Sequence, residues 1–390
     1  MNNTSSGNPD SSDAFGFEID FLPVGETEGD AICMRWGYHL DDPSRRRQFV
    51  MVVDGGYQGD GQAIVRHLKK WYGMKHDVKI NVMANTHPDQ DHISGLEEIF
   101  NEPGVKVEKL IMQRPWNISQ PSTLFEDNNL KDEYIQRIIK EKLSSAVQLE
   151  KTAKRICKSE IIDAIQGGPL ICELGVSCWA LSPSTKDYRE LFPYFSFTPG
   201  EAKDIGDVRV KPKKGPWYLN RLQDDGATSA SNESSLVLCL VLPIQGRNVV
   251  LLTGDAGQTA LGNAVSYAGR QGIDLPSRIR LFQVPHHGSA QNLGPTILDK
   301  LFGPGLDNIH CRSSRISAVA SVSAESDSMH PSQQVVNELA CHGICLAVTK
   351  GHTYNFQIGD LRVRPVLEWS PVEPVGPFDN LDETTDERTK

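Results

Sequence analysis

The feature that most constrains this chain is a tight group of polar residues between a strand-like and a helix-like stretch. Residues 79–86 predict a strand, and the apolar spacing of residues 93–100 predicts a helix. Between them, four side chains that can ligate a metal occupy six positions: His87, Asp89, Asp91 and His92. Imidazole and carboxylate ligands suit zinc, manganese or iron. Asp89 or Asp91 could instead cap the helix, but a cap needs one such residue and not four.

The surrounding pattern predicts two sheets flanked by helices. Residues 17–36 contain two apolar segments separated by a turn, which is typical of a hairpin. Residues 48–53 predict a strand that ends at Asp54-Gly55-Gly56, whose glycines permit a sharp exit. A second strand-rich half ends with two apolar runs, residues 344–348 and 354–358, which predict a final hairpin. Strands that alternate with helical stretches favour an α/β architecture of two sheets with helices outside.

We expect one large domain over residues 17–370, with a helical insertion at about residues 113–168. Residues 1–16 are rich in Asn, Ser and Gly and have neither a basic start nor an apolar run, so they predict a disordered lead and not a targeting peptide. Residues 371–390 are Pro-rich and acidic and predict a disordered, solvated tail.

Composition limits the environment of the protein. The chain has 390 residues, of which 38% are hydrophobic, enough to bury a large core. No stretch approaches the roughly 20 apolar residues that a membrane span needs. Eight cysteines without CxxC pairs predict reduced thiols. We therefore expect a cytoplasmic protein that does not contact a membrane.

Net charge limits the partners. A net charge of −10 argues against a general nucleic-acid coat, since clustered Lys and Arg drive phosphate binding. A polyanionic substrate would have to meet a local basic patch. The best candidate is residues 208–222, where basic side chains alternate with two aromatic ones: Arg209, Lys211, Lys213, Lys214, Trp217, Tyr218 and Arg221. An exposed basic loop anchored by two aromatics is the alternative.

The motif at residues 87–92 resembles the HxHxDH signature of the metallo-β-lactamase superfamily, with Asp89 in place of the second histidine. Other family motifs are matched by Asp54, by Asp255 in a Thr-Gly-Asp sequence, and by the pair His286-His287. The resemblance implies a four-layer αββα sandwich that holds two divalent metal ions, zinc or manganese. It also implies that Asp255 bridges the two ions and that Asp54 orients the metal loop without binding metal.

A closer resemblance is to the C-terminal hydrolase domain of bacterial DNA-uptake competence proteins of the ComEC type, here in a soluble stand-alone form. It spans roughly residues 17–358 outside the insertion. It rests on residues 21–25, Gly29-Asp30-Ala31, residues 232–238, the Thr-Gly-Asp and His-His-Gly-Ser segments, and His330-Pro331.

Two departures from the family pattern affect the metal site. The histidine of the usual third motif has no clear counterpart, because Leu181-Ser182-Pro183-Ser184 occupies the expected place. The first metal site would then be open, weakly held or completed by water. Asp89 is a harder ligand than histidine and tilts the metal preference from zinc toward manganese.

The resemblance suggests how the ligands divide between the two ions. His87 and Asp89 would hold one ion, and Asp91, His92 and one of the pair His286-His287 the other. We favour His286 as the ligand, since it leaves its strand first, with His287 in outer contact with metal or substrate.

His330 has a second possible role. It precedes Pro331-Ser332, and phosphodiesterase members use such a segment to contact the scissile phosphate or to protonate the leaving group. A helix that begins at Pro331 could also direct backbone amides at an anion. The alternative is that His330 only caps that helix.

These residues predict a metal-dependent hydrolase that uses a metal-activated hydroxide. The leading hypothesis is a phosphodiesterase or nuclease that acts on nucleic acid or a nucleotide, with Asp91 and His330 as catalytic residues. The alternatives are a carbonyl-ester hydrolase of the lactonase, thioesterase or β-lactamase kind, and a regulatory scaffold that has lost turnover. The sequence does not indicate any protein partner.

Overall fold

The computed structural model describes residues 15–25, 28–127, 129–199, 221–306, 315–324, 330–359, 361–362, 364 and 370–372. The predicted disordered lead at residues 1–16 lies outside this part of the chain up to residue 14, and its last two residues belong to β1 (Phe15–Phe21). The predicted tail at residues 371–390 lies outside it from residue 373. Pro371, expected in the tail, belongs to β15 (Ser370–Pro371).

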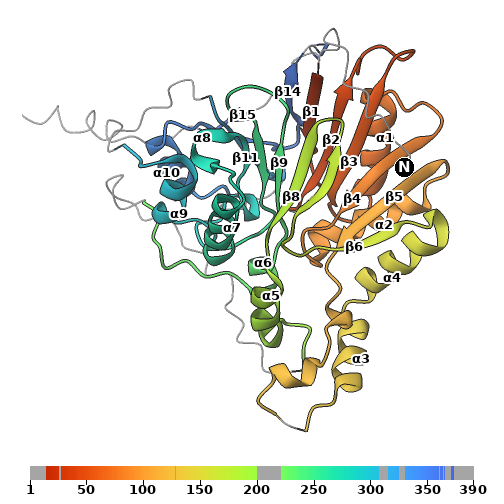
Figure 1. Cartoon of the computed structure of the whole chain (residues 1–390), viewed down its shortest axis with the longest axis vertical. Helices are drawn as coiled ribbons and strands as arrows, with labels where there is room; N and C mark the ends of the chain where they lie inside the picture. The colour runs from red at the N-terminus through yellow and green to blue at the C-terminus, as the bar shows by residue number, and fades with distance from the viewer. Residues whose placement is uncertain are drawn as a thin grey trace, which may run out of the picture.

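The described residues form two sheets, of seven and eight strands (Figure 1). The first has the order β14-β1-β2-β3-β4-β5-β6. Its other strands are β2 (Ala31–Tyr38), β3 (Arg47–Gly55), β4 (Val78–Ala84), β5 (Val105–Met112), β6 (Glu160–Asp163) and β14 (Tyr354–Gly359). The second has the order β15-β13-β12-β11-β10-β9-β8-β7. It contains β7 (Pro169–Glu173), β8 (Val176–Ser182), β9 (Val237–Val241), β10 (Val249–Leu252), β11 (Ile279–Gln283), β12 (Ser317–Ala320) and β13 (Leu346–Val348).

Helices cover the outer side of each sheet, as Figure 1 shows. Beside the first sheet lie α1 (Asp60–Trp71), α2 (Gln90–Asn101) and α4 (Ser144–Thr152), and α3 (Asp132–Lys142) extends beyond its edge. Beside the second lie α7 (Gln258–Arg270), α8 (Leu275–Arg278), α9 (Pro295–Phe302) and α10 (Gln333–Cys341). The short helices α5 (Thr185–Leu191) and α6 (Ala230–Glu233) follow β8 along the chain. In the part of the chain that is described, no helix is both long and apolar enough to cross a bilayer.

The strands bury both of their faces, which explains why the two sheets lie between layers of helices. Side chains alternate along a strand, so neighbouring residues enter different cores. In β3, Val50 and Val52 pack against α1 and α2, whereas Met51 and Val53 pack between the sheets. The strands β9 and β10 divide in the same way between the inter-sheet core and the core beneath α7 and α9. The chain is therefore an α/β sandwich, as the sequence predicts at this level.

Parallel strands in both sheets end at one edge of the sandwich. The strands β3, β4, β5 and β6 are parallel neighbours in the first sheet, and β10, β11, β12 and β13 in the second. Ligand sites of open α/β sheets lie beyond the carboxyl ends of such strands. The candidate metal residues occupy these positions, because Asp54, His87, Asp255 and His286 lie at or just after the ends of β3, β4, β10 and β11.

Three details differ from the sequence predictions. The predicted insertion is helical over α3 and α4 but ends earlier than expected, because residues 160–163 form β6 and pair with β5. The predicted final hairpin is wrong: β13 belongs to the second sheet, and β14 crosses to the first, where it pairs with β1. The strands β7 and β8 were not predicted. The hairpin predicted at residues 17–36 is confirmed by the pairing of β1 with β2.

Candidate metal centre

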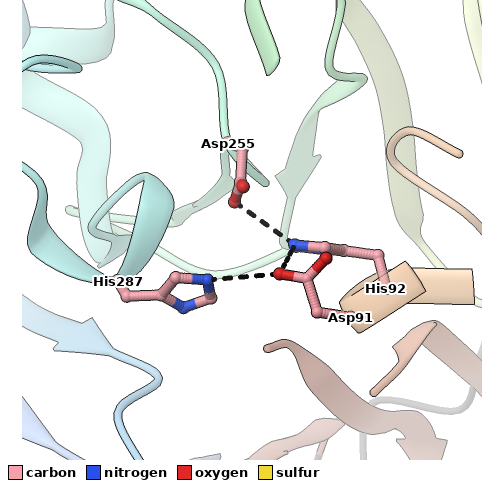
Figure 2. A group of neighbouring side chains, drawn as sticks. All are labelled: Asp91, His92, Asp255 and His287. Atoms are coloured by element: carbon pink, nitrogen blue, oxygen red, sulfur yellow. Dashed lines mark ion pairs between the residues drawn. The ribbon is translucent and has the colours of Figure 1, made fainter. Parts of the chain in front are cut away.

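Four of the predicted ligands come together between the two sheets. Asp91, His92, Asp255 and His287 each place one ligand atom within 4.8 Å of the others. The Nε2 atom of His92 lies 3.4 Å from Oδ1 of Asp255 and 3.5 Å from Oδ2 of Asp91, which is itself 3.7 Å from Nε2 of His287. Figure 2 shows Asp91 and His92 entering from the start of α2, with His287 facing them from the opposite side.

The other carboxylate oxygen of Asp255 faces a second set of side chains. Its Oδ2 lies 3.7 Å from Nε2 of His87 and 3.7 Å from Nε2 of His286. Oδ2 of Asp89 lies 3.6 Å from the same His87 nitrogen. Asp255 therefore stands between two groups of ligand atoms and directs one oxygen at each.

The four imidazoles all present Nε2 to the centre, because each Nδ1 has an acceptor behind it. The backbone carbonyl at Ser321 can only accept, so Nδ1 of His287 must donate to it. Thr86 donates its hydroxyl proton to Asp54 and keeps a lone pair for His87. The four Nδ1 contacts are His87 to Thr86 Oγ1 (3.1 Å), His92 to Asp54 (2.8 Å), His286 to Asn292 Oδ1 (3.0 Å) and His287 to the Ser321 carbonyl (2.9 Å). In the neutral ring, this leaves the Nε2 lone pair for a metal.

The inward-facing atoms lack protein partners. Nε2 of His87, His92 and His287, together with Oδ1 of Asp255, are buried without a hydrogen bond to any described residue. Such an atom costs about 1–3 kcal/mol if nothing satisfies it. Two ligands about 2.1 Å from one tetrahedral ion would lie about 3.4 Å apart, close to the spacings seen here. The donor set thus fits a divalent cation.

The electrostatics of the pocket also favour a cation. Burial alone would lower the pKa of His92, but the carboxylates of Asp255 and Asp91 hold it well above its usual value. Burial likewise opposes charge on His287, yet its contact with Asp91 and the nearby Asp255 raises its pKa to about 9. Burial would raise the pKa of Asp255, but His92 and His286 hold it well below its usual range. The buried carboxylates require positive charge, which protons or a metal can supply.

Asp54 lies behind the ligands and not among them. Its carboxylate accepts from Nδ1 of His92, from the backbone N–H and hydroxyl of Thr86, and from the side-chain amide of Asn85. It therefore holds the rings of both His92 and, through Thr86, His87. This is the orienting position that the family resemblance predicts.

Four residues at the centre were not among the predicted site residues. Asp30 lies with Asp54 on the far side of His92, where Gln283 donates to its Oδ2 (2.8 Å). Burial raises the pKa of Asp30, so its carboxyl group favours the neutral form. Ser231 donates to Oδ1 of Asp89 (2.7 Å), and Asn292 holds His286. Only Asp30 lay in a segment that the resemblance had singled out. Ser231 and Asn292 have no signature in the sequence.

His330 lies beside the predicted ligands. Its ring centroid is 5.9 Å from that of His286, and its Nε2 lies 3.7 Å from Oε2 of Glu28. The capping alternative for His330 is wrong. The helix α10 begins at Gln333, and its cap is Ser332, whose hydroxyl accepts from the N–H of Gln334 (3.3 Å). The helix expected at Pro331 therefore starts two residues later.

Three other expectations about the site need correction or lie outside the described residues. It is His287, and not the favoured His286, that joins Asp91 and His92. Asp89 occupies the cap position of α2 but makes no side-chain cap hydrogen bond. The segment in place of the third motif supplies no ligand, because Ser184 caps α5.

Most of the basic segment at residues 208–222 lies outside the described residues, including the predicted patch members Arg209, Lys211, Lys213, Lys214, Trp217 and Tyr218. The described part begins at Arg221, which binds Glu338 through two hydrogen bonds. Leu222 is buried.

Comparison with known proteins adds no name to this centre. No family model matches the chain, and no curated protein matches it. The class that fold and site define is an α/β protein with an Asp/His cluster suited to a metal ion.

Proposed function

We propose that this protein is a metal-dependent hydrolase of the metallo-β-lactamase fold that holds two divalent ions, zinc or manganese. One observation carries the proposal: four imidazoles, each fixed through Nδ1, direct Nε2 at the two oxygens and close neighbours of one buried carboxylate, Asp255. A scaffold without turnover would have no chemical need for so many buried, unpaired ligand atoms.

The chain's own residues would divide the work. Asp91, His92, Asp255 and His287 would hold one ion. Bound ions would lower the pKa of a shared water toward neutrality and so provide a nucleophile at pH 7. Asp255 would fix the spacing of the centre, and Asp54 would keep the His92 ring in the orientation that ligation needs.

The proposed substrate is a phosphodiester, in nucleic acid or a nucleotide. His330 supports this choice, because it lies next to the ligand His286 without sharing the contacts to Asp255. An imidazole at that place can hydrogen-bond a phosphate oxygen or protonate a leaving alkoxide. Glu28, 3.7 Å from His330, would hold the ring in position.

A substrate screen with the full chain tests the proposal. Bis-p-nitrophenyl phosphate, single-stranded DNA and cyclic dinucleotides would be assayed with added Mn²⁺ or Zn²⁺. The variant Asp91→Ala/His92→Ala serves as the negative control, and His352→Gln, at an exposed position, as the matched control. We expect the double variant to lose more than about a hundredfold in rate, because even residues behind metal ligands contribute roughly 10–100-fold.

The outcomes separate the alternatives. Cleavage that needs metal and disappears in the double variant supports a phosphodiesterase. Bound metal without phosphodiester cleavage would instead favour a carbonyl-ester hydrolase. A chain that binds no metal would contradict the proposal and favour a scaffold.

A further inference from the structure

The turn after β11 separates two adjacent histidines. His286 and His287 have φ values of 47° and 57°, in the left-handed region, and Gly288 follows with φ 89°. A left-handed conformation costs a non-glycine residue roughly 1–2 kcal/mol. The turn directs the two imidazoles to different carboxylates: His286 Nε2 lies 3.7 Å from Asp255 Oδ2, and His287 Nε2 lies 3.7 Å from Asp91 Oδ2.

Asn292 fixes the orientation of His286. This fully buried amide donates to the backbone carbonyl of Asp255 (2.8 Å), so its oxygen is free to accept from Nδ1 of His286 (3.0 Å). One side chain thereby ties His286 to the chain segment that carries Asp255. The ring of His286 is held with Nε2 toward the Asp255 carboxylate and not toward solvent.

The space near this Asp255 oxygen contains a second, independent sign of a ligand. Nε2 of His87 is completely buried, has no hydrogen-bond partner among the described residues, and lies 3.7 Å from the same oxygen that His286 faces. Asp89 is also prepared, because Ser231 holds its Oδ1 and leaves Oδ2 beside His87. Two imidazoles and two carboxylates therefore converge from separate elements.

We propose that His286 replaces the histidine missing from the third motif, so that His87, Asp89, Asp255 and His286 form a complete site for a second divalent cation. This inference rests on the proposed function and deepens it. The first site is then neither open nor dependent on water for its fourth ligand. Both sites have two imidazoles and two carboxylates, and they share Asp255. A role for His286 in substrate contact is the competing explanation, since His330 lies beside it.

Metal counting distinguishes these explanations without an activity assay. The metal-free full chain would be titrated with Co²⁺, and bound metal would be measured after gel filtration together with the visible absorption of each ion. We expect two ions per chain for the wild type and for the surface control His352→Gln. We expect one ion for His286→Ala and one for Asp89→Ala, with the visible spectrum of the remaining ion retained in both.

Two further measurements protect the test from misfolding. Thermal unfolding of His286→Ala would show that the variant is folded. Added imidazole should restore the second ion in this variant, because the ring that it replaces is partly open to solvent. Asn292→Ala should keep two ions but bind the second about 10–100-fold more weakly.

Several results would overturn the inference. Two ions bound with unchanged affinity in His286→Ala would assign His286 to substrate contact. A single ion in both wild type and His286→Ala would show that the second site does not form, while the metal-dependent hydrolase would stand with one ion. No metal in the wild type would contradict the proposed function itself.

Discussion

Asp255 directs its two carboxylate oxygens at different histidines: Oδ1 lies 3.4 Å from Nε2 of His92, and Oδ2 lies 3.7 Å from Nε2 of His87. These histidines lie on either side of the start of α2, whereas Asp255 follows β10 in the other sheet. The carboxylate therefore links the two sheets through the centre that we propose to hold metal.

Removal of this carboxylate should affect both ions at once. We expect Asp255→Ala to bind less than one ion per chain and to lose more than about a hundredfold in hydrolysis rate, since ligand loss should exceed the roughly 10–100-fold cost of changes behind the ligands. Elemental analysis after gel filtration measures the first effect. The exposed Asp225→Ala is the matched control, and loss of only one ion in Asp255→Ala would show that Asp255 does not bridge.

The carboxylate of Asp54 should influence metal affinity without changing stoichiometry. In Asp54→Asn, an amide replaces the acceptor that holds Nδ1 of His92 and the Thr86 hydroxyl. The ring of His92 then loses its fixed orientation, so we expect metal to bind about 10–100-fold more weakly. Isothermal titration with Mn²⁺ or Zn²⁺ measures this change. Unchanged affinity would contradict the orienting role.

His330 should affect chemistry and not metal content. As a proton donor to the leaving group, it would contribute about 10²–10⁴-fold to cleavage of a DNA phosphodiester, whose alkoxide is a poor leaving group. Bis-p-nitrophenyl phosphate should lose much less, because p-nitrophenolate leaves without a proton. We expect His330→Ala to show this difference with both ions bound. Equal losses on the two substrates would instead indicate a phosphate contact.

A buried ion-pair network far from the metal centre should stabilise the fold. Arg364 contacts Glu18 (2.9 Å) and Asp20 (2.8 Å), both in β1 and both fully buried. Removing one partner of a buried pair costs about 3–5 kcal/mol. We expect Arg364→Ala to lower the free energy of unfolding by about that amount at pH 7, measured by urea denaturation, while the exposed Arg362→Ala changes it little.

The pH dependence of this loss follows from Asp20. Burial would raise the pKa of Asp20, but His67 and Arg364 outweigh burial and hold its pKa below the usual value of 3.8. A carboxyl group whose pKa is lowered by folding adds stability above its unfolded pKa, and that stability disappears as pH falls through the folded value. The difference between wild type and Arg364→Ala should therefore shrink below about pH 4. A difference that stays constant would assign the effect to packing.

The local part of the site could be predicted from the sequence. His87, Asp89, Asp91 and His92 are close in sequence, and the strand and helix patterns on either side place them in one connecting loop. The division of His286 and His287 could not be predicted, because it depends on left-handed backbone angles at both residues. Ser231 and Asn292 act through contacts 142 and 6 residues away in sequence, and nothing in their neighbours signals those contacts.

The fold was predicted at the level of its class but not in all pairings. Alternating apolar residues identify β1, β2 and β3, whose faces are buried by neighbours close in sequence. The strand β14 was misassigned because periodicity shows that a strand is half-buried and does not show which sheet it joins. Its partner, β1, lies more than 300 residues earlier in the chain. The short strand β7 has mostly exposed residues, so it lacks the apolar signal on which the prediction depends.

The most direct test of the central claim is the rate of bis-p-nitrophenyl phosphate hydrolysis after metal removal with EDTA and during stepwise return of Mn²⁺ or Zn²⁺. The account predicts no hydrolysis by the stripped protein, recovery that saturates near two ions per chain, and no recovery in Asp91→Ala/His92→Ala. Hydrolysis that survives EDTA, or that returns equally in the double variant, would contradict a metal centre built on Asp91, His92, Asp255 and His287.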